Sequence, residues 1–467
     1  MSQRDRFERF VARFPHDHRT FFQRPHWTRR CFFQLLGSGI TGSFLSQRYA
    51  GAADAITQSS VSTVNKARNV IFILLAGAPS HIDTFDFKFV PGVTPETFQP
   101  ETIQGLTWPV GLLPKLADHL PKMAIVRSVR AWVLVHSLAQ TWTQIGRNPA
   151  AALGNIAPNI GSIVAIEKDS ERLPSQVFPT FLALNSDGAA GPGYLPSAYA
   201  PFKVTPSARG ITNTSHPDGP AVFEDRWKLL HALDDSLRIK SPLGSEPEDY
   251  ESFYRAARGL MYNPAVTQAF QFTADDSLRY GGTGFGNACL IAKQVLAAAQ
   301  GTRFIQITQG GWDMHSNIYN PDLASSLPKM GKLLDNGFSA LLSDLAADGL
   351  LDTTLVLMVG EFGRTVGPLT AAQGRDHFPQ QFAVFAGAGV AGGRAIGATN
   401  DNGSDAAEFG WSRNRYIKPE DLEATIYSAM GINWTTVRHD DPLGRGFEYV
   451  PFSGDDLYGP ITELWKA

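Results

Sequence analysis

The sequence predicts an α/β protein built on a mainly parallel sheet with helices on both of its faces. Short, continuous apolar runs alternate with longer segments of helical periodicity, and each run ends in a polar or glycine-rich loop. Nearly continuous apolar runs are typical of strands buried on both faces. The clearest runs are 69–75, 123–129, 303–307, 353–359 and 382–385.

Helical spacing separates these runs. Apolar residues recur every three or four positions over 325–347, and 286–299 carries an apolar stripe. A helix is expected from about Ser137, and another over 420–430 begins at Pro419, because proline favours the first turn of a helix. Strands that alternate with helices of this length indicate parallel strand connections.

Composition and charge describe an ordinary globular protein. The chain has 467 residues, of which 43% are hydrophobic and 18% are charged. Residues 1–52 hold nine arginines and three acidic residues, so the remaining chain has 32 basic and 41 acidic residues, a net charge of −9. Such an acidic body does not indicate a nucleic-acid surface. The two cysteines, Cys31 and Cys289, are too few for a disulfide framework or a thiolate metal site.

The N-terminal segment has the features of an export leader. Arg29 and Arg30 precede the apolar, glycine-containing stretch 32–45, and the small residues 50–52 offer a cleavage site. This order resembles a twin-arginine signal, and the alternative is a basic amphipathic helix. The apolar stretch is too short for a membrane span, and no other segment reaches that length. We therefore expect export to the periplasm or the cell exterior.

The same features predict the domain boundaries. The leader is expected to cover 1–52 and a polar linker 53–67, followed by a single α/β domain over 68–455. Proline, glycine and serine are frequent between about 170 and 270, so this stretch is expected to be a loop-rich insertion with short helices such as 225–237.

Acidic, imidazole and basic side chains stand at the ends of the predicted strands. Ligands of such sheets gather at the carboxyl ends of the strands. The groups are His81 and Asp83 after 69–75, His136 and Ser137 after 123–129, Asp313 and His315 after 303–307, Glu361 and Arg364 after 353–359, and Arg375, Asp376 and His377 before 382–385.

Carboxylates and imidazoles without thiolates predict a site for one or two divalent ions. The candidates are zinc, manganese, calcium and magnesium. The expected metal ligands are His81, Asp83, Asp313, His315, Glu361, Asp376 and His377. Structural roles are the alternatives: turn capping by His81 and Asp83, an ion pair of Glu361 with Arg364, orientation of His377 by Asp376, and a buried His136 with satisfied hydrogen bonds.

Several motifs resemble a known bacterial family, the one called domain of unknown function 1501. That family is placed in the alkaline phosphatase-like superfamily with sulfatases and cofactor-independent phosphoglycerate mutases. The resemblance spans about 69–450 and implies an alkaline phosphatase-like three-layer sandwich. The motifs are LLAGAPSHIDTFD (74–86), GGWDMHSN (310–317), GEFGRT (360–365), the run that begins GRDHFP at 374, and the middle segment 178–202.

The resemblance also implies roles for individual residues. As in the phosphoglycerate mutases, Asp313 and His315 are followed by a long helix, a strand and a further acidic ligand, here Glu361 in place of aspartate. His377 matches the late metal-binding histidine of the superfamily. The superfamily's first-strand aspartate is absent from 76–77, so a ligand has to reach back from the loop that follows.

The nucleophile position lies in the segment HSLAQTWTQIGR, 136–147. It is similar to the sulfatase helix that begins with cysteine or serine and ends in Thr-Gly-Arg, which places His136 or Ser137 at the nucleophile position. Two alternatives remain open: His136 is a metal ligand, or water on the metal attacks.

These observations predict an exported, metal-dependent hydrolase of phosphate or sulfate esters, with a small-molecule or polysaccharide substrate. Arg364 or Arg375 is expected to hold the non-transferred oxygens, since guanidinium groups bind such oxygens with paired donors. The alternative is a secreted binding or assembly protein that derives from the same superfamily and has lost catalysis.

Overall fold

The computed structural model describes residues 56–238 and 254–466. Contacts divide the chain into two units, and residues 56–230 and 249–467 form the larger one, which contains the sheet. The predicted leader, the start of the predicted linker and Cys31 lie outside the described residues. No helix in the described parts of the chain is long and apolar enough to cross a membrane.

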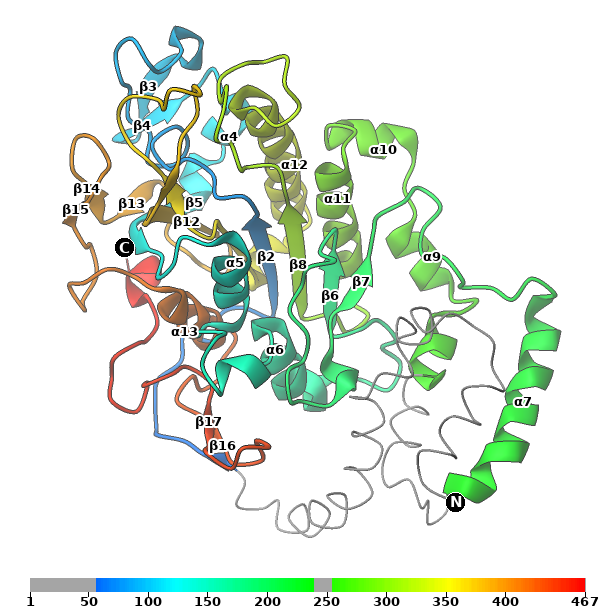
Figure 1. Ribbon diagram of the computed structural model, residues 1–467. Coiled ribbons are helices and arrows are strands. Elements are labelled where there is room, and N and C mark those ends of the chain that lie inside the picture. Colours follow the sequence, from blue (N-terminus) through cyan, green and yellow to red (C-terminus); the bar gives the residue numbers. More distant parts are fainter. Residues whose placement is uncertain (1–55, 239–253, 467) are drawn as a thin grey trace, which may run out of the picture. The chain divides into compact units, whose positions relative to one another are not determined.

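The larger unit is organised around an eight-stranded sheet with the order β13-β5-β12-β9-β2-β8-β6-β7 (Figure 1). Seven strands are parallel to one another, and β12 alone runs in the opposite direction, between β5 and β9. The strands are β2 (Asn69–Leu75), β5 (Met123–Arg130), β6 (Phe181–Leu184), β7 (Phe202–Val204), β8 (Phe304–Gln309), β9 (Thr354–Val359), β12 (Gln380–Ala386) and β13 (Arg394–Ile396).

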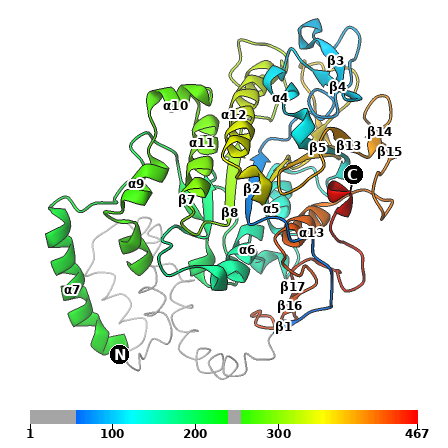
Figure 2. The ribbon, with the colours of Figure 1, turned by 180° about the vertical axis from the view of Figure 1, so that it is seen from behind.

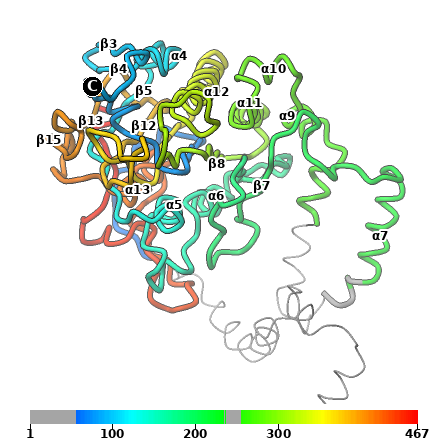
Figure 3. Tube along the Cα trace, turned by 45° about the horizontal axis from the view of Figure 1, so that its top comes forward, coloured from blue at the N-terminus to red at the C-terminus, as the bar shows by residue number. Residues whose placement is uncertain are grey.

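Helices cover both faces of this sheet, which confirms the predicted fold class. On β2, Ile71 and Ile73 belong to the core shared with α11 and α12, whereas Val70 and Phe72 belong to the opposite core with α6 and α13. Figure 3 shows α11 and α12 on one side of β8 and α5 and α6 on the other. The helices are α5 (His136–Ile145), α6 (Ile160–Lys168), α11 (Gly284–Ala297), α12 (Leu327–Ala347) and α13 (Pro419–Ala429).

The expected long helix is α12. Its buried residues Met330, Leu334, Phe338, Leu341 and Leu345 recur at helical spacing and face the sheet. The helix begins after Ser326 with Pro328 in its first turn, and ends before Gly349, whose φ of +68° favours glycine.

The stretch expected to be a loop-rich insertion contributes two strands to the main sheet. β6 and β7 extend the sheet beyond β8, and the intervening chain 185–201 consists of turns and a short 3₁₀ helix, η7 (Ser197–Tyr199). Strands of four and three residues are too short to carry a periodic signal. The expected helix 225–237 lies within the longer α7 (Gly219–Arg238).

The predicted polar linker contains a two-residue strand. β1 (Ile56–Thr57) pairs with β16 (Val437–Arg438), which in turn pairs with β17 (Phe447–Glu448) (Figure 2). A backbone ladder of this kind does not require apolar side chains, and both residues of β1 are exposed.

Candidate metal centre

Four segments bring their polar residues to one edge of the sheet. Because β5, β8 and β9 are parallel, the segments that follow them begin at the same edge. β12 runs the other way, so the residues that precede it reach this edge as well. The polar residues are His136 at the start of α5, Asp313 and His315 after β8, Glu361 after β9, and Asp376 and His377 before β12.

A two-residue ladder fixes the last of these segments beside the loop after β9. β10 (Gly363–Arg364) pairs antiparallel with β11 (His377–Phe378), and Arg364 is the register partner of His377. The close packing has no room for a side chain at Gly363, because a Cβ there would lie 1.8 Å from the Gln380 carbonyl oxygen. The ladder therefore sets the position of His377 through backbone hydrogen bonds.

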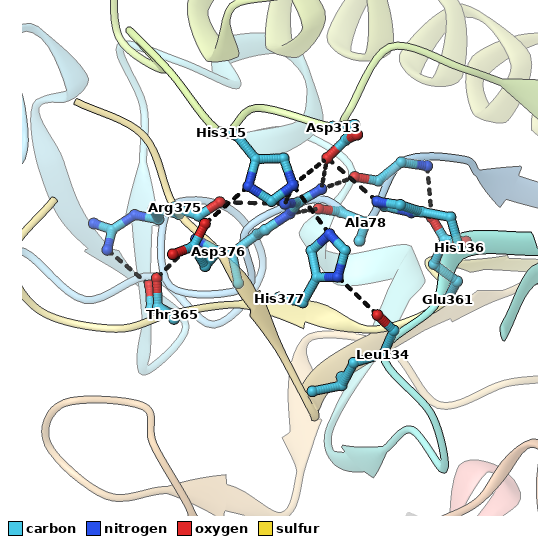
Figure 4. Close-up of polar contacts among 12 residues, drawn as sticks. Ala78, Leu134, His136, Asp313, His315, Glu361, Thr365, Arg375, Asp376 and His377 are labelled. Atoms are coloured by element: carbon cyan, nitrogen blue, oxygen red, sulfur yellow. Dashed lines mark hydrogen bonds and ion pairs between the residues drawn. The ribbon is translucent and has the colours of Figure 1, made fainter. Parts of the chain in front are cut away.

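Three imidazoles and one carboxylate converge at this edge (Figure 4). His136, Asp313, His315 and His377 each offer one ligand atom, and these four atoms all lie within 4.8 Å of one another. The side chains of Asp313 and His315 are 48% and 45% exposed, so a ligand can reach them from solvent.

Each of the three histidines is held through its Nδ1 atom. Nδ1 of His136 lies 2.8 Å from Oε1 of Glu361, and Nδ1 of His315 lies 2.9 Å from Oδ1 of Asp376. Nδ1 of His377 donates to the carbonyl oxygen of Leu134 at 2.7 Å. An acceptor at Nδ1 keeps the hydrogen there and leaves the Nε2 lone pair free for a metal.

The Nε2 atoms face one another and Asp313. Nε2 of His315 lies 3.0 Å from Nε2 of His377 and 3.0 Å from Oδ1 of Asp313, and Nε2 of His136 lies 3.3 Å from the same oxygen. Two Nε2 lone pairs at 3.0 Å repel each other unless a cation or a proton lies between them. Nε2 of His136 is buried without a hydrogen-bond partner among the described residues. The donor set therefore fits a divalent metal.

A buried arginine supports the carboxylate of this cluster. Arg364 Nη2 lies 2.6 Å from Oδ1 of Asp313. Partial burial opposes ionisation of Asp313, but the hydrogen bond and the charge of Arg364 outweigh it and lower the pKa of this carboxyl group. The N–H groups of Arg364 donate to Asp313 and to the backbone carbonyls of Gly77, Ala78 and Arg375. Its Nη1 also lies 3.3 Å from Nε2 of His315, a contact that a metal bound to this nitrogen would replace.

All five guanidinium donors of Arg364 are therefore directed at protein acceptors. To hold substrate oxygens, as the sequence predicts, Arg364 would have to release one of these acceptors. In this structure Arg364 positions Asp313 and links it to the backbone at 77–78.

Glu361 is buried behind His136 rather than among the four converging donors. Its Oε1 accepts from Nδ1 of His136 and from the backbone N–H of Gly77, at 2.8 and 2.7 Å. Burial raises the pKa of Glu361, and its Oε2 has no hydrogen-bond partner among the described residues. Gly77 is required here, because its φ is +103° and a Cβ would lie 2.5 Å from the backbone nitrogen of Asp313.

Asp83 and Arg375 belong to a separate buried network, and His81 is buried in the same loop as Asp83 with a backbone partner of its own. Arg375 Nε lies 2.7 Å from Oδ2 of Asp83, which also accepts from the Ser80 hydroxyl, and Tyr319 donates to Oδ1. The remaining donors of Arg375 bond to backbone carbonyls and to Tyr319. Nε2 of His81 contacts the carbonyl of Gly403, and burial lowers the pKa of this histidine. These three residues hold the loop after β2 in place.

Ser137 and Asp376 lie next to the cluster in different roles. Ser137 is the exposed second residue of α5, and within the described chain no histidine or carboxylate accepts a hydrogen bond from its hydroxyl. Asp376 orients His315 instead of its neighbour His377. The neighbour that orients His377 is the Leu134 carbonyl, which no side-chain pattern in the sequence could have indicated.

Comparison with known proteins identifies a family and similar folds. A family model described as protein of unknown function (DUF1501) matches residues 67–455, which confirms the predicted family. The sequence matches no curated protein.

Several solved structures are similar to the chain. Ps i-CgsB is 12% identical with a TM-score of 0.42, and the match covers 85% of this chain and 79% of that one. PsFucS1 sulfatase from Pseudoalteromonas sp. is 11% identical (84% and 71% covered, TM-score 0.36). A protein in the alkaline phosphatase superfamily from Vibrio parahaemolyticus is 10% identical (81% and 69% covered, TM-score 0.36).

Proposed function

The chain belongs to the DUF1501 family, and on this premise we propose that it is an exported, metal-dependent hydrolase of phosphate or sulfate esters. The observation that carries the proposal is the convergence of three Nε2 atoms on Oδ1 of Asp313 at a solvent-accessible sheet edge. The resemblance of its strand-end motifs to the alkaline phosphatase-like superfamily supports phosphate or sulfate as the transferred group.

The donor set favours zinc over calcium or magnesium. Three imidazoles and one carboxylate are ligands for zinc or a similar transition metal, whereas calcium and magnesium prefer oxygen ligands. A divalent ion held there would lower the pKa of water and offset the negative charge of the transferred group.

The chain's own residues prepare this site. Glu361, Asp376 and the Leu134 carbonyl orient the three imidazoles, and Arg364 keeps Asp313 ionised. Burial lowers the pKa of His377, an effect to which the charge of Arg364 adds, so that this ring is neutral and able to bind a metal near neutral pH. The half-exposed Asp313 leaves the donors open to an anionic ester.

The test combines metal analysis with a panel of chromogenic phosphate and sulfate esters. We expect the purified protein to contain about one zinc ion per chain and to cleave at least one ester class. Chelation should abolish the cleavage and zinc should restore it, because the ion carries the charge stabilisation. Tightly bound zinc without turnover of any ester would instead identify the non-catalytic alternative, and a metal-free, inactive protein would contradict the proposal.

Ser137→Ala serves as a further arm of this test. Since its hydroxyl has no base to activate it in the structure, we expect the variant to keep its zinc and to lose less than about tenfold in kcat. Loss of turnover with zinc retained would assign the attacking group to Ser137.

Export has its own test. We propose that the twin-arginine signal at Arg29 and Arg30 directs the protein out of the cytoplasm. Replacement of both residues by lysine should retain the protein in the cytoplasmic fraction, because this pathway reads the arginine pair. A protein that still leaves the cytoplasm after both replacements would point to another export route.

A further inference from the structure

Residues 132–135, between β5 and α5, expose apolar side chains next to the metal cluster. Trp132, Leu134 and Val135 are 45%, 38% and 59% exposed. Val133 lies between them and packs against a small buried cluster formed by neighbouring elements. Consecutive exposed apolar residues cost solubility and usually mark a surface that contacts a ligand or partner. We call residues 132–135 the apolar segment.

The apolar segment is joined directly to the metal cluster. It ends where His136 begins α5, and the carbonyl of Leu134 accepts the hydrogen bond from Nδ1 of His377 (Figure 4). A chain advances at most about 3.6 Å per residue, so the Cα atoms of Trp132 and His136 are no more than about 14 Å apart. A ligand bound at the four donors is therefore within reach of the segment.

The tryptophan of this segment is held in place by its neighbours. Its Nε1 lies 3.1 and 3.0 Å from the two carboxylate oxygens of Glu420, a buried residue that also accepts from Trp142 at 2.9 Å. The Trp132 and Trp142 rings stack with centroids 6.1 Å apart, and Nζ of Lys418 lies 3.7 Å from the Trp132 ring centroid. A ring fixed in advance loses little side-chain entropy when it binds a ligand.

From this arrangement we infer that the apolar segment is the subsite for the organic group of the ester, and that this group presents an apolar surface. An aromatic ring and the C–H face of a sugar both have this property. The inference rests on the proposed function, in which the anionic end of the same molecule lies at the donors of His136, Asp313, His315 and His377. The ester then bridges a charged site and an apolar one that are neighbours in the chain.

The test compares two non-hydrolysable anions, phenylphosphonate and methylphosphonate, by calorimetry on the zinc-loaded protein. The wild type should bind phenylphosphonate roughly tenfold more tightly. The double variant Trp132→Gln, Val135→Thr removes apolar surface and leaves Leu134, whose carbonyl orients His377, unchanged. It should lose most of this preference while its affinity for methylphosphonate and its zinc content stay unchanged.

Leu278→Asn is the matched control, because Leu278 is 68% exposed in α10 (Ala274–Arg279) and lies outside the apolar segment. This variant should bind both phosphonates as tightly as the wild type. Trp132→Phe retains a ring but removes the N–H that donates to Glu420. It should weaken the binding of phenylphosphonate and leave that of methylphosphonate unchanged. A methylenephosphonate analogue of glucose 6-phosphate distinguishes a sugar subsite from an aromatic one. If the segment binds sugars, the double variant should also lose affinity for this analogue.

Equal affinity of the two phosphonates in the wild type, or an unchanged preference in the double variant, overturns the inference. The outcome is independent of catalysis: a phenyl preference in a protein that cleaves no ester would support the subsite and reject the hydrolase. Ester cleavage without any phenyl preference would support the hydrolase and reject the subsite.

Discussion

Asp313→Ala is expected to lose bound zinc and ester cleavage together. Oδ1 of Asp313 lies 3.0 Å from Nε2 of His315 and 3.3 Å from Nε2 of His136, so it is the anionic atom that the imidazoles surround. Without it, three neutral rings face the buried cation of Arg364, which disfavours a second cation. Metal affinity should fall by more than the roughly 10- to 100-fold that losing an orienting partner costs.

Metal content and the dissociation constant for zinc, measured beside kcat/KM, check this result. Asp187→Ala is the matched control, because Asp187 is an exposed aspartate shortly after β6, whose carboxyl end lies at the same sheet edge. It should retain zinc and activity. If Asp313→Ala keeps both at the wild-type level, the four-residue cluster is not the metal centre.

Glu361→Gln is expected to weaken zinc binding about 10- to 100-fold without unfolding the protein. The amide oxygen can replace Oε1 and still accept from Gly77 and His136, so the local geometry is kept. The negative charge that makes His136 a stronger donor to the metal is lost. Burial raises the pKa of Glu361, which means that its ionised form is disfavoured, so a neutral side chain should maintain or raise the midpoint of thermal unfolding.

Competition with a chromophoric chelator gives the zinc dissociation constant of this variant. Glu420→Gln is a suitable control, since Glu420 is also a buried carboxylate with a raised pKa due to burial, but it accepts from Trp132 and Trp142 instead of a metal-binding histidine. Its zinc affinity should equal that of the wild type. Unchanged affinity in Glu361→Gln would show that Glu361 does not act through His136.

Much of the fold was predictable because its strands are buried on both faces. The run at 69–75 coincides with β2, and the boundaries of the runs at 123–129, 303–307, 353–359 and 382–385 lie within two residues of those of β5, β8, β9 and β12. A strand between two helical layers is apolar at nearly every position, so its run can be recognised from the sequence alone. The short strands β6, β7 and β13 carry too few residues to show this signal.

The convergence of Asp313, His315 and His377 was also predictable, since groups at the ends of neighbouring strands meet at one edge. The division of roles was not. Asp83 has the same residue type and strand-end context as Asp313, yet the structure pairs it with Arg375 in the protein interior. A carboxylate's role depends on which cation lies within about 4 Å, and that partner is 292 residues away in the chain.

What the sequence by itself determined is the class of the fold and the chemistry available at the edge of its sheet, because both follow from local patterns of apolar and polar residues. The tertiary structure alone decided three things: the reversed direction of β12, which brings His377 to that edge; the Nδ1 contacts that turn three Nε2 atoms toward Asp313; and the position of the apolar segment 132–135 beside them. The first two depend on contacts between residues distant in the sequence, and the third on the contact of Leu134 with His377, so their distances and angles are set only when the sheet and its covering helices pack together.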